Sequence, residues 1–589
     1  MRSVKPVSPA AAPIHYQVAP ADLHAHLFRV TLTIQQPTAA QGLSLPAWIP
    51  GSYLVREFAR HLQGLQARQG RRAVPLRQLD KCSWEALCDP ARPLTLSYEV
   101  YAFDNSVRAA WLDATRGFFN GTSLCLRVHG QEDLPHGLTL TPTKATASWS
   151  VATALTPLRA TKAGFGSYQA ANYGELVDHP VELGLFWQGR FSACGVPHRF
   201  VVAGALPSFD GERLVADARK ICEAQIRFWH GRGKPPHKHY LFLLNAVDDG
   251  YGGLEHGHST ALICGRRDLP RLGEAKASEG YATLLGLISH EYFHTWNVKR
   301  LRPAEFAHYA WGQENYTQLL WFFEGFTSYY DDVLLRRAGL IDDVAYLKLV
   351  NKTLNQVMQT PGREVQSVAE ASFDAWVKYY RQDENTPNST VSYYTKGALV
   401  ALCFDLTLRQ EGHATLDQVM RALWTRCKAG PMSEADFAAV LAELGGRSFA
   451  REIAAWVHGT EELPLKALLQ HHGVTVHEDP AQLAQRLGLR VTETDGLRIK
   501  MVLRGGAAEQ GGLAAGDEWL GVEVGAKSSG WRLRKLDDLL PCVGPQRKFT
   551  ALVARDQRLL RLPLELPAAS TTWRLAWRDP TGAHAWPGH

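Results

Sequence analysis

The sequence predicts a multidomain α+β protein with an antiparallel N-terminal β-domain, a mainly helical central domain and a C-terminal domain of short strands. Its 589 residues exceed what a single hydrophobic core usually holds. With 45% hydrophobic and 21% charged residues, the composition is that of a globular protein. The residue pattern changes twice along the chain, which places the predicted domains at residues 1–205, 206–475 and 476–568, followed by a tail at 569–589.

The first 200 residues are rich in short segments where apolar and polar residues alternate. Residues 24–34, 94–101 and 123–128 are examples, each with β-branched or aromatic side chains and each followed by turn residues. This pattern is typical of antiparallel β-strands with one buried face.

Apolar spacing becomes helical from about residue 210. Residues 214–229 show this period, a strand is predicted at 239–245, and helices then predominate to about residue 470, including 394–406 and 437–444.

Short strands return at 497–503, 519–524 and 548–553. A glycine-rich stretch at 505–517 separates the first two. The chain from Pro567 to its last residue also contains Pro580 and Pro587, which predicts a poorly structured tail.

Charge and cysteine usage exclude several classes of protein. The net charge of +6 is spread along the chain without a dense basic cluster, so no nucleic-acid partner is expected. The sequence contains no run of 18 apolar residues, so no membrane span is expected. The residues after Met1 lack the apolar segment of a signal peptide, so none is predicted. The nine cysteines are scattered without a Cys-x-x-Cys pair, which indicates reduced thiols. The cytoplasm is the simplest location.

The segment His290-Glu-Tyr-Phe-His294 is the most informative part of the chain. On a helix, residues four apart share a face, so both imidazoles can bind one Zn²⁺ ion. Glu291 is rotated by about 100° from His290, a position from which it can reach the attacking water without being a ligand. The apolar, proline-free residues 281–289 support the helix.

Catalytic zinc keeps three protein ligands, so a third must come from elsewhere in the chain. Glu324 is the candidate, because it lies in the strongly apolar segment 316–330, where a carboxylate is costly to bury unless it is paired or bound to a metal. The predicted cofactor is therefore one Zn²⁺ per chain, held by His290, His294 and Glu324.

Three segments carry a family resemblance when taken together. The motif continues after His294 as Thr-Trp-Asn-Val-Lys-Arg-Leu-Arg-Pro303, Tyr251-Gly-Gly-Leu-Glu-His256 precedes it, and residues 46–58 read Pro-Ala-Trp-Ile-Pro-Gly-Ser-Tyr-Leu-Val-Arg-Glu-Phe. The chain resembles the glycyl aminopeptidase family of metallopeptidases, which pair a gluzincin domain with a PDZ domain. This resemblance implies that the catalytic domain is thermolysin-like.

The resemblance also implies substrate-binding roles. Glu255 would hold the α-ammonium of the substrate, and Gly252 and Gly253 would let the substrate backbone approach closely. His256 would bond substrate backbone and is not assigned to the metal.

A tyrosine that donates to the developing oxyanion is implied by Tyr394-Thr-Lys-Gly397, which matches a Tyr-x-Lys-Gly element. Tyr393 beside it leaves the choice open. Catalysis would then use Glu291 as general base and Tyr394 as oxyanion donor.

Gly512-Leu-Ala-Ala-Gly-Asp517 ahead of a strand is similar to the PDZ pattern. A peptide carboxyl terminus is the ligand that this implies, although the carboxylate loop, nearest to residues 486–489, is only weakly matched.

The sequence thus predicts a zinc aminopeptidase that removes small N-terminal residues, Gly and Ala first, from peptides with a free amino terminus. Two alternatives remain: a zinc endopeptidase of the same clan, and a PDZ scaffold with an inactive peptidase domain.

Overall fold

The computed structural model describes residues 12–525, 529–568, 570–579 and 586, and the chain divides into two compact units. The first unit contains everything up to residue 316, together with 337–340 and 427–432. The second contains 317–336, 341–426 and the residues from 433 onward.

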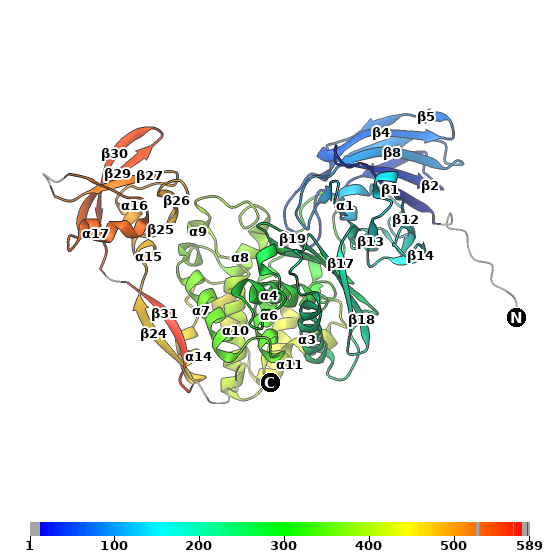
Figure 1. Cartoon of the computed structure of the whole chain (residues 1–589). Helices are drawn as coiled ribbons and strands as arrows, with labels where there is room; N and C mark the ends of the chain where they lie inside the picture. Colours follow the sequence, from blue (N-terminus) through cyan, green and yellow to red (C-terminus); the bar gives the residue numbers. More distant parts are fainter. Residues whose placement is uncertain (1–11, 526–528, 569, 580–585, 587–589) are drawn as a thin grey trace. The chain divides into compact units, whose positions relative to one another are not determined.

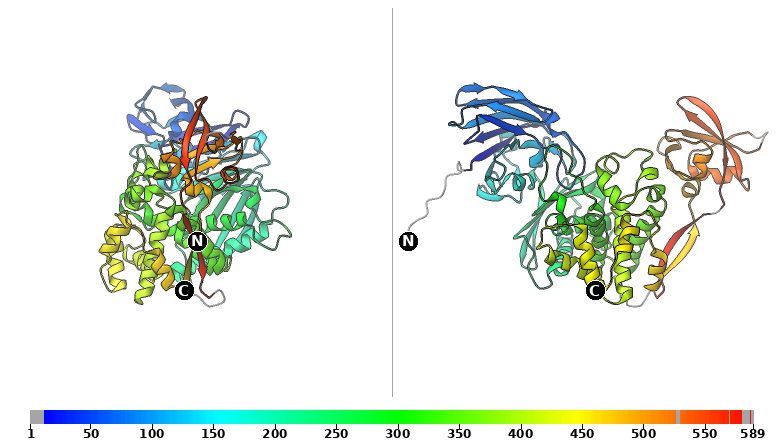
Figure 2. Two further views of the ribbon diagram at one scale, coloured as in Figure 1. Left: turned by 90° about the vertical axis from the view of Figure 1, so that its left-hand side faces the viewer. Right: turned by 180° about the vertical axis from the view of Figure 1, so that it is seen from behind.

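Three sheets form the N-terminal β-domain of the first unit (Figures 1 and 2). The largest has the order β14 (Thr156–Ala160), β15 (Gly166–Ala170), β12 (His136–Leu140), β1 (Ile14–Asp22), β2 (Leu27–Ile34), β8 (Leu94–Tyr101), β4 (Leu62–Gln69) and β5 (Arg72–Val74). The second has the order β13 (Ser150–Ala152), β16 (Val181–Gly184), β10 (Arg116–Phe119) and β9 (Ala110–Leu112). The third has the order β11 (Arg127–Val128), β3 (Ala40–Ser44), β7 (Ser83–Leu87) and β6 (Leu76–Gln78).

Strand pairing in these sheets is antiparallel except between β1 and β12, which confirms the predicted β-rich N-terminal domain. Buried and more exposed residues alternate along β2 and β8, as the sequence pattern predicts.

The strand predicted at 123–128 is wrong. Gly121–Leu124 forms the short helix α1, and only Arg127–Val128 is a strand, β11. Three buried tyrosine hydroxyls donate to the carbonyls that a strand partner would otherwise bind: Tyr98 to Leu124 at 2.7 Å, Tyr173 to Cys125 at 2.8 Å and Tyr16 to Leu126 at 2.5 Å. These side chains satisfy a buried backbone that has no neighbouring strand.

A five-stranded sheet carries the catalytic part of the first unit, in the order β17 (Trp187–Ala193), β18 (Val196–Ala203), β19 (Tyr240–Val247), β21 (Ser259–Gly265) and β20 (Tyr251–Glu255). Helix α3 (Gly211–His230) packs on β17, and α4 (Glu279–Phe293) packs on β20 and β21. Strands β17 and β18, expected in the N-terminal domain before residue 206, thus belong to this sheet. Alternation reveals a strand but not the sheet that it joins. The first unit also contains α2 (Tyr173–Val177) and the paired β22 (Arg302–Pro303) and β23 (Pro431–Met432).

The second unit begins with helices, as predicted. They are α5 (Leu320–Phe323), α6 (Gly325–Arg337), α7 (Asp343–Met358), α8 (Val368–Phe373), α9 (Thr386–Ser389), α10 (Thr395–Glu411), α11 (Leu416–Arg426), α12 (Glu434–Gly445), α13 (Ala450–Glu452) and α14 (Leu465–His471). No described helix has both the length and the apolar character needed to cross a membrane.

A C-terminal module of short strands and helices follows. Its elements are α15 (Leu483–Leu487), β25 (Leu489–Thr492), β26 (Arg498–Val502), α16 (Ala507–Gln510), β27 (Glu518–Glu523), β28 (Trp531–Arg532), α17 (Leu539–Val543), β29 (Lys548–Arg555) and β30 (Arg558–Glu565). The module has its own apolar core, which includes Leu487, Trp519 and Leu539. The predicted strands at 497–503, 519–524 and 548–553 are therefore confirmed, with small shifts at their ends.

Two strands on either side of this module pair with each other: β24 (Val474–Pro480) and β31 (Thr571–Trp577) form an antiparallel ribbon (Figure 1). Asn355 of α7 fixes β31, donating to the Trp573 carbonyl at 2.7 Å and accepting from the Trp573 N–H at 3.1 Å. The tail predicted from residue 569 therefore contains an ordered strand. Its partner lies about a hundred residues earlier, so a local pattern could not reveal the pairing.

Candidate active site

Helix α4 carries the His-Glu-x-x-His motif and places its two histidines as predicted. Ser278 caps the helix, because its hydroxyl accepts a hydrogen bond from the Tyr281 N–H at 3.0 Å. His290 lies in the last turn and His294 directly follows the helix. Their ring centroids are 4.7 Å apart, so both imidazoles lie on the same face.

The turn after α4 fixes the orientation of His294. Its Nδ1 lies 2.7 Å from the carbonyl oxygen of Asn297. A carbonyl only accepts, so Nδ1 carries the proton and Nε2 keeps its lone pair for a metal. Val298 follows with a φ of +120°, an unfavourable conformation for a β-branched residue. Such strain is of order 1–3 kcal/mol and persists where surrounding contacts over-determine the backbone, often at functional sites.

Glu324 lies between α5 and α6 and is 2% exposed. The next residue, Gly325, packs against α10: a Cβ built on it would lie 2.6 Å from the Cα of Gly397. Both glycines follow motif residues, Glu324 and Lys396, and they let the two helices meet backbone to backbone. This contact brings the Glu324 segment beside the Tyr394 segment within the second unit.

Two groups of described side chains could hold a metal ion. The first is His290, His294 and Glu324, the predicted ligands; the second is Glu255, Glu291 and His294. Two imidazoles and one carboxylate are a ligand set typical of catalytic zinc in peptidases. The second group would use the motif glutamate as a ligand, which leaves no general base on α4. The donor chemistry of the first group therefore fits the ion better.

Glu291 is buried against the strand β20. A Cβ built on Gly253 would lie 2.0 Å from its Oε1, so any larger residue at 253 would displace the carboxylate. A Cβ on Gly252 would instead have no heavy atom nearer than 3.6 Å. Gly253 is thus required by Glu291 itself, a constraint that the sequence did not reveal.

Glu255 ends β20 and is 4% exposed. Ligand atoms of Glu255, Glu291 and His294 all lie within 4.8 Å of one another. In the part of the chain that the structure describes, the Glu255 carboxylate accepts no hydrogen bond and forms no ion pair. Lys299 acts on it only through space, because its ammonium pairs with Asp178. A buried carboxylate without a direct ion pair is costly, so this position is suited to a cationic ligand group.

His256 is oriented by Asp178. The Nδ1 of His256 lies 3.1 Å from Asp178 Oδ1, which also accepts from Lys299 Nζ at 2.7 Å. Burial alone would raise the pKa of Asp178, but Lys299 and His256 hold it well below its usual range. The Nε2 of His256 is buried without a hydrogen-bond partner in the described chain. The substrate-binding role of His256 stays a prediction. Only its Nε2 is available for that role, because Nδ1 binds Asp178.

Tyr394 directly precedes α10 as its N-cap, and Tyr393 lies one residue earlier. The two rings stack at 4.8 Å between centroids, and Tyr393 is completely buried whereas Tyr394 is partly exposed. Burial, and then the charge of Glu324, raise the pKa of the Tyr394 phenol well above its usual value. Tyr394 therefore stays protonated as a donor beside Glu324, and its exposure favours it over Tyr393.

We expect Tyr394→Phe to lower kcat by roughly 10²–10³-fold, the usual effect of losing one oxyanion donor. The ring and its stacking remain, so KM and metal content should change little. Tyr393→Phe is the matched control and should be nearly silent. Steady-state kinetics on an aminoacyl amide checks this, and the opposite ranking would assign the role to Tyr393.

Known proteins match the chain over most of its length. Residues 15–185 match the Peptidase M61 N-terminal domain, and residues 283–400 match the M61 glycyl aminopeptidase model. The crystal structure of an aminopeptidase N family protein from Idiomarina loihiensis is 38% identical, with a TM-score of 0.91, and the match covers 96% of this chain and 98% of that one. The chain belongs to the M61 glycyl aminopeptidase family.

Membership of the M61 family confirms the predicted resemblance and the enzyme class, a zinc aminopeptidase. An M1 zinc metallopeptidase from Deinococcus radiodurans is also similar, at 16% identity and a TM-score of 0.47, with 77% of this chain and 94% of that chain covered. No curated protein sequence matches. The M61 models do not extend to the C-terminal module, whose PDZ assignment stays a prediction.

Proposed function

We propose that this M61 aminopeptidase removes small N-terminal residues, Gly and Ala first, from peptides with a free amino terminus. The observation that carries the proposal is Glu255, a buried carboxylate beside Glu291 and His294 that forms no direct ion pair with Lys299, whose ammonium pairs with Asp178 instead. The α-ammonium of a peptide supplies the missing cation, whereas an acylated amine or an internal peptide bond does not. The preference for small residues rests on the family resemblance.

Each residue has one role in this proposal. His290, His294 and Glu324 hold one zinc ion per chain, which when bound polarises the scissile carbonyl and lowers the pKa of water toward about 7. Glu291 takes a proton from the attacking water and passes it to the leaving amine. Tyr394 donates to the oxygen that becomes negative, and Glu255 anchors the substrate ammonium.

The competing function is a zinc endopeptidase in which Glu255 does not recognise a free amine. The third function, a scaffold with an inactive peptidase domain, is disfavoured because Glu291 and all three predicted ligands are present. To decide among these functions, the turnover of Gly and Ala 4-nitroanilides is compared with that of bulkier aminoacyl amides and of the N-acetylated forms.

We expect turnover of the free-amine substrates only, fastest for Gly and Ala. The matched variant Glu255→Gln keeps the side-chain size and removes the charge, so it should raise KM for free amines and reduce discrimination against the acetylated form. Equal cleavage of free and acetylated substrates by the natural enzyme would establish the endopeptidase instead.

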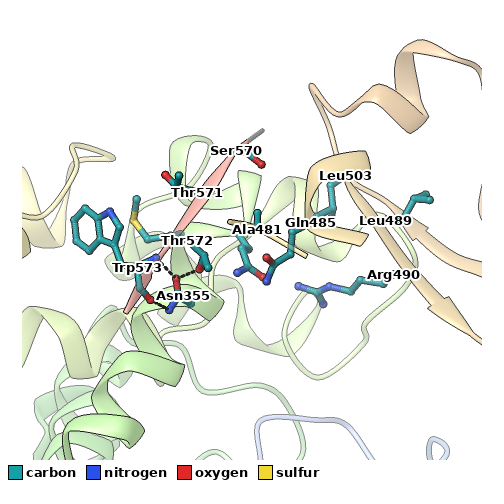
Figure 3. Close-up of a pocket in the computed structure, with 12 residues that line it drawn as sticks. Asn355, Ala481, Gln485, Leu489, Arg490, Leu503, Ser570, Thr571, Thr572 and Trp573 are labelled. Carbon is teal, nitrogen blue, oxygen red and sulfur yellow. Dashed lines mark hydrogen bonds between the residues drawn. The ribbon is translucent and has the colours of Figure 1, made fainter. Parts of the chain in front are cut away.

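For the C-terminal module we propose a PDZ-like domain that binds peptide carboxyl termini. Its strand β25 is at the edge of the sheet and follows Gly488, whose φ is +71°. An edge strand can accept a peptide as an additional strand. A cavity of about 300 Å³ borders β25 and is lined by Leu489, Arg490 and residues of α7 and β31 (Figure 3).

A further inference from the structure

The strand that carries Glu255 is held by its sheet on one side only. In the described chain, β20 is the last strand of the five-stranded sheet and pairs only with β21. Among the residues of the N-terminal β-domain that contact β20 or the residues directly after it are Gly51, Arg108 and Asp178. None of them belongs to the peptidase motif.

Gly51 packs directly on the carboxylate of Glu255. It occupies the third position of the turn Ile49-Pro-Gly-Ser52, which the Ser52 N–H closes by donating to the Ile49 carbonyl at 3.1 Å. Its φ of +89° suits the Pro-Gly pair of a type II turn. A Cβ built on Gly51 would lie 2.5 Å from both carboxylate oxygens of Glu255. The turn leaves no space for a side chain.

Arg108 and Asp178 hold the backbone on either side of Glu255. Arg108 donates to the Gly253 carbonyl at 3.0 Å, and Asp178 accepts from the Gly257 N–H at 2.9 Å. Asp178 also pairs with Lys299 in the loop after α4. The segment that carries Glu255 is thereby tied both to the N-terminal domain and to the end of the zinc-motif helix.

We propose that the N-terminal β-domain sets the selectivity of the enzyme for free amino termini, with Gly51 and Asp178 as positioning residues that act through Glu255. The proposal rests on the proposed role of Glu255 as the ammonium anchor. The Gly51 turn prevents the carboxylate from moving toward the N-terminal domain, and Asp178 fixes the backbone that follows. Neither residue takes part in proton transfer.

Gly51→Ala tests the first contact, and Gly64→Ala is its matched control. Gly64 also has a positive φ, +65°, but an added Cβ would meet nothing within 4 Å. Both alanines must adopt a positive φ, and only the first displaces Glu255. We expect Gly51→Ala to raise KM for Gly 4-nitroanilide by about tenfold or more with kcat nearly unchanged, and Gly64→Ala to leave both parameters unchanged.

The double variant Gly51→Ala/Glu255→Gln adds a second measurement. If the methyl group acts through Glu255, it should add little once the carboxylate charge is gone, so the two effects should not be additive. Additive effects, or the same KM for Gly51→Ala and Gly64→Ala, would overturn the role of Gly51. Loss of kcat alone would also overturn it, because a positioning effect on the anchor appears in KM.

Asp178→Asn tests the second contact, although it leaves the buried Lys299 ammonium without its partner. The double variant Asp178→Asn/Lys299→Met removes both charges and should recover thermal stability while KM stays raised. Recovery of KM as well would show that Asp178 only balances charge. If the natural enzyme cleaves acetylated and free substrates equally, the proposed function fails; if it discriminates but these variants do not change KM, only this inference fails.

Discussion

Glu291→Gln should lower turnover by roughly 10²–10⁴-fold while the protein keeps its fold and its metal. The amide has the same shape as the carboxylate, so it fits against Gly253, where a Cβ would already lie 2.0 Å from Oε1. It cannot accept the proton of the attacking water, so the loss should appear in kcat. Glu279→Gln, at the exposed start of the same helix, is the control and should be silent.

Metal analysis of the same variant distinguishes the two possible ligand groups. If the ion is held by His290, His294 and Glu324, Glu291→Gln retains one zinc per chain. If it is held by the group that contains Glu255, the variant loses metal together with activity, and the assignment of Glu291 as general base is wrong.

Removal of zinc by a chelator should abolish peptidase activity, and stoichiometric zinc should restore it. The ion is expected to supply several kcal/mol of charge stabilisation that no described side chain replaces. Glu324→Gln should lower zinc content and activity together, whereas Glu255→Gln should keep zinc and raise KM. The zinc-to-protein ratio and the kinetics are measured on one preparation of each variant. Full activity in metal-free protein would refute the zinc mechanism.

The sequence predicts those parts of the site that depend on local spacing. His290 and His294 share a face because residues four apart do so on any helix, and the apolar surroundings of Glu324 indicate that a carboxylate there needs a partner. Local spacing does not decide between Tyr394 and Tyr393, because Tyr394 precedes α10 and its ring stacks on that of Tyr393.

Tertiary contacts account for what the sequence could not show. Gly51 and Asp178 are distant in sequence from Glu255, and no motif or period indicates that they meet it. The prediction of a strand at 123–128 is wrong for the same reason: tyrosines from distant parts of the chain bind the carbonyls of residues 124–126. The membership of β17 in the catalytic sheet likewise depends on which strand pairs with it.

The ribbon formed by β24 and β31 has a consequence for synthesis of the protein. Val474 pairs with Trp577, so β24 emerges from the ribosome about a hundred residues before its partner. The C-terminal module lies between β24 and β31 in sequence, so it is translated before β31 is available to pair with β24. Translation that stops within the module would leave β24 as an unpaired edge, which exposes such an intermediate to aggregation. The contact between Asn355 of α7 and β31 can form only after β31 has been translated.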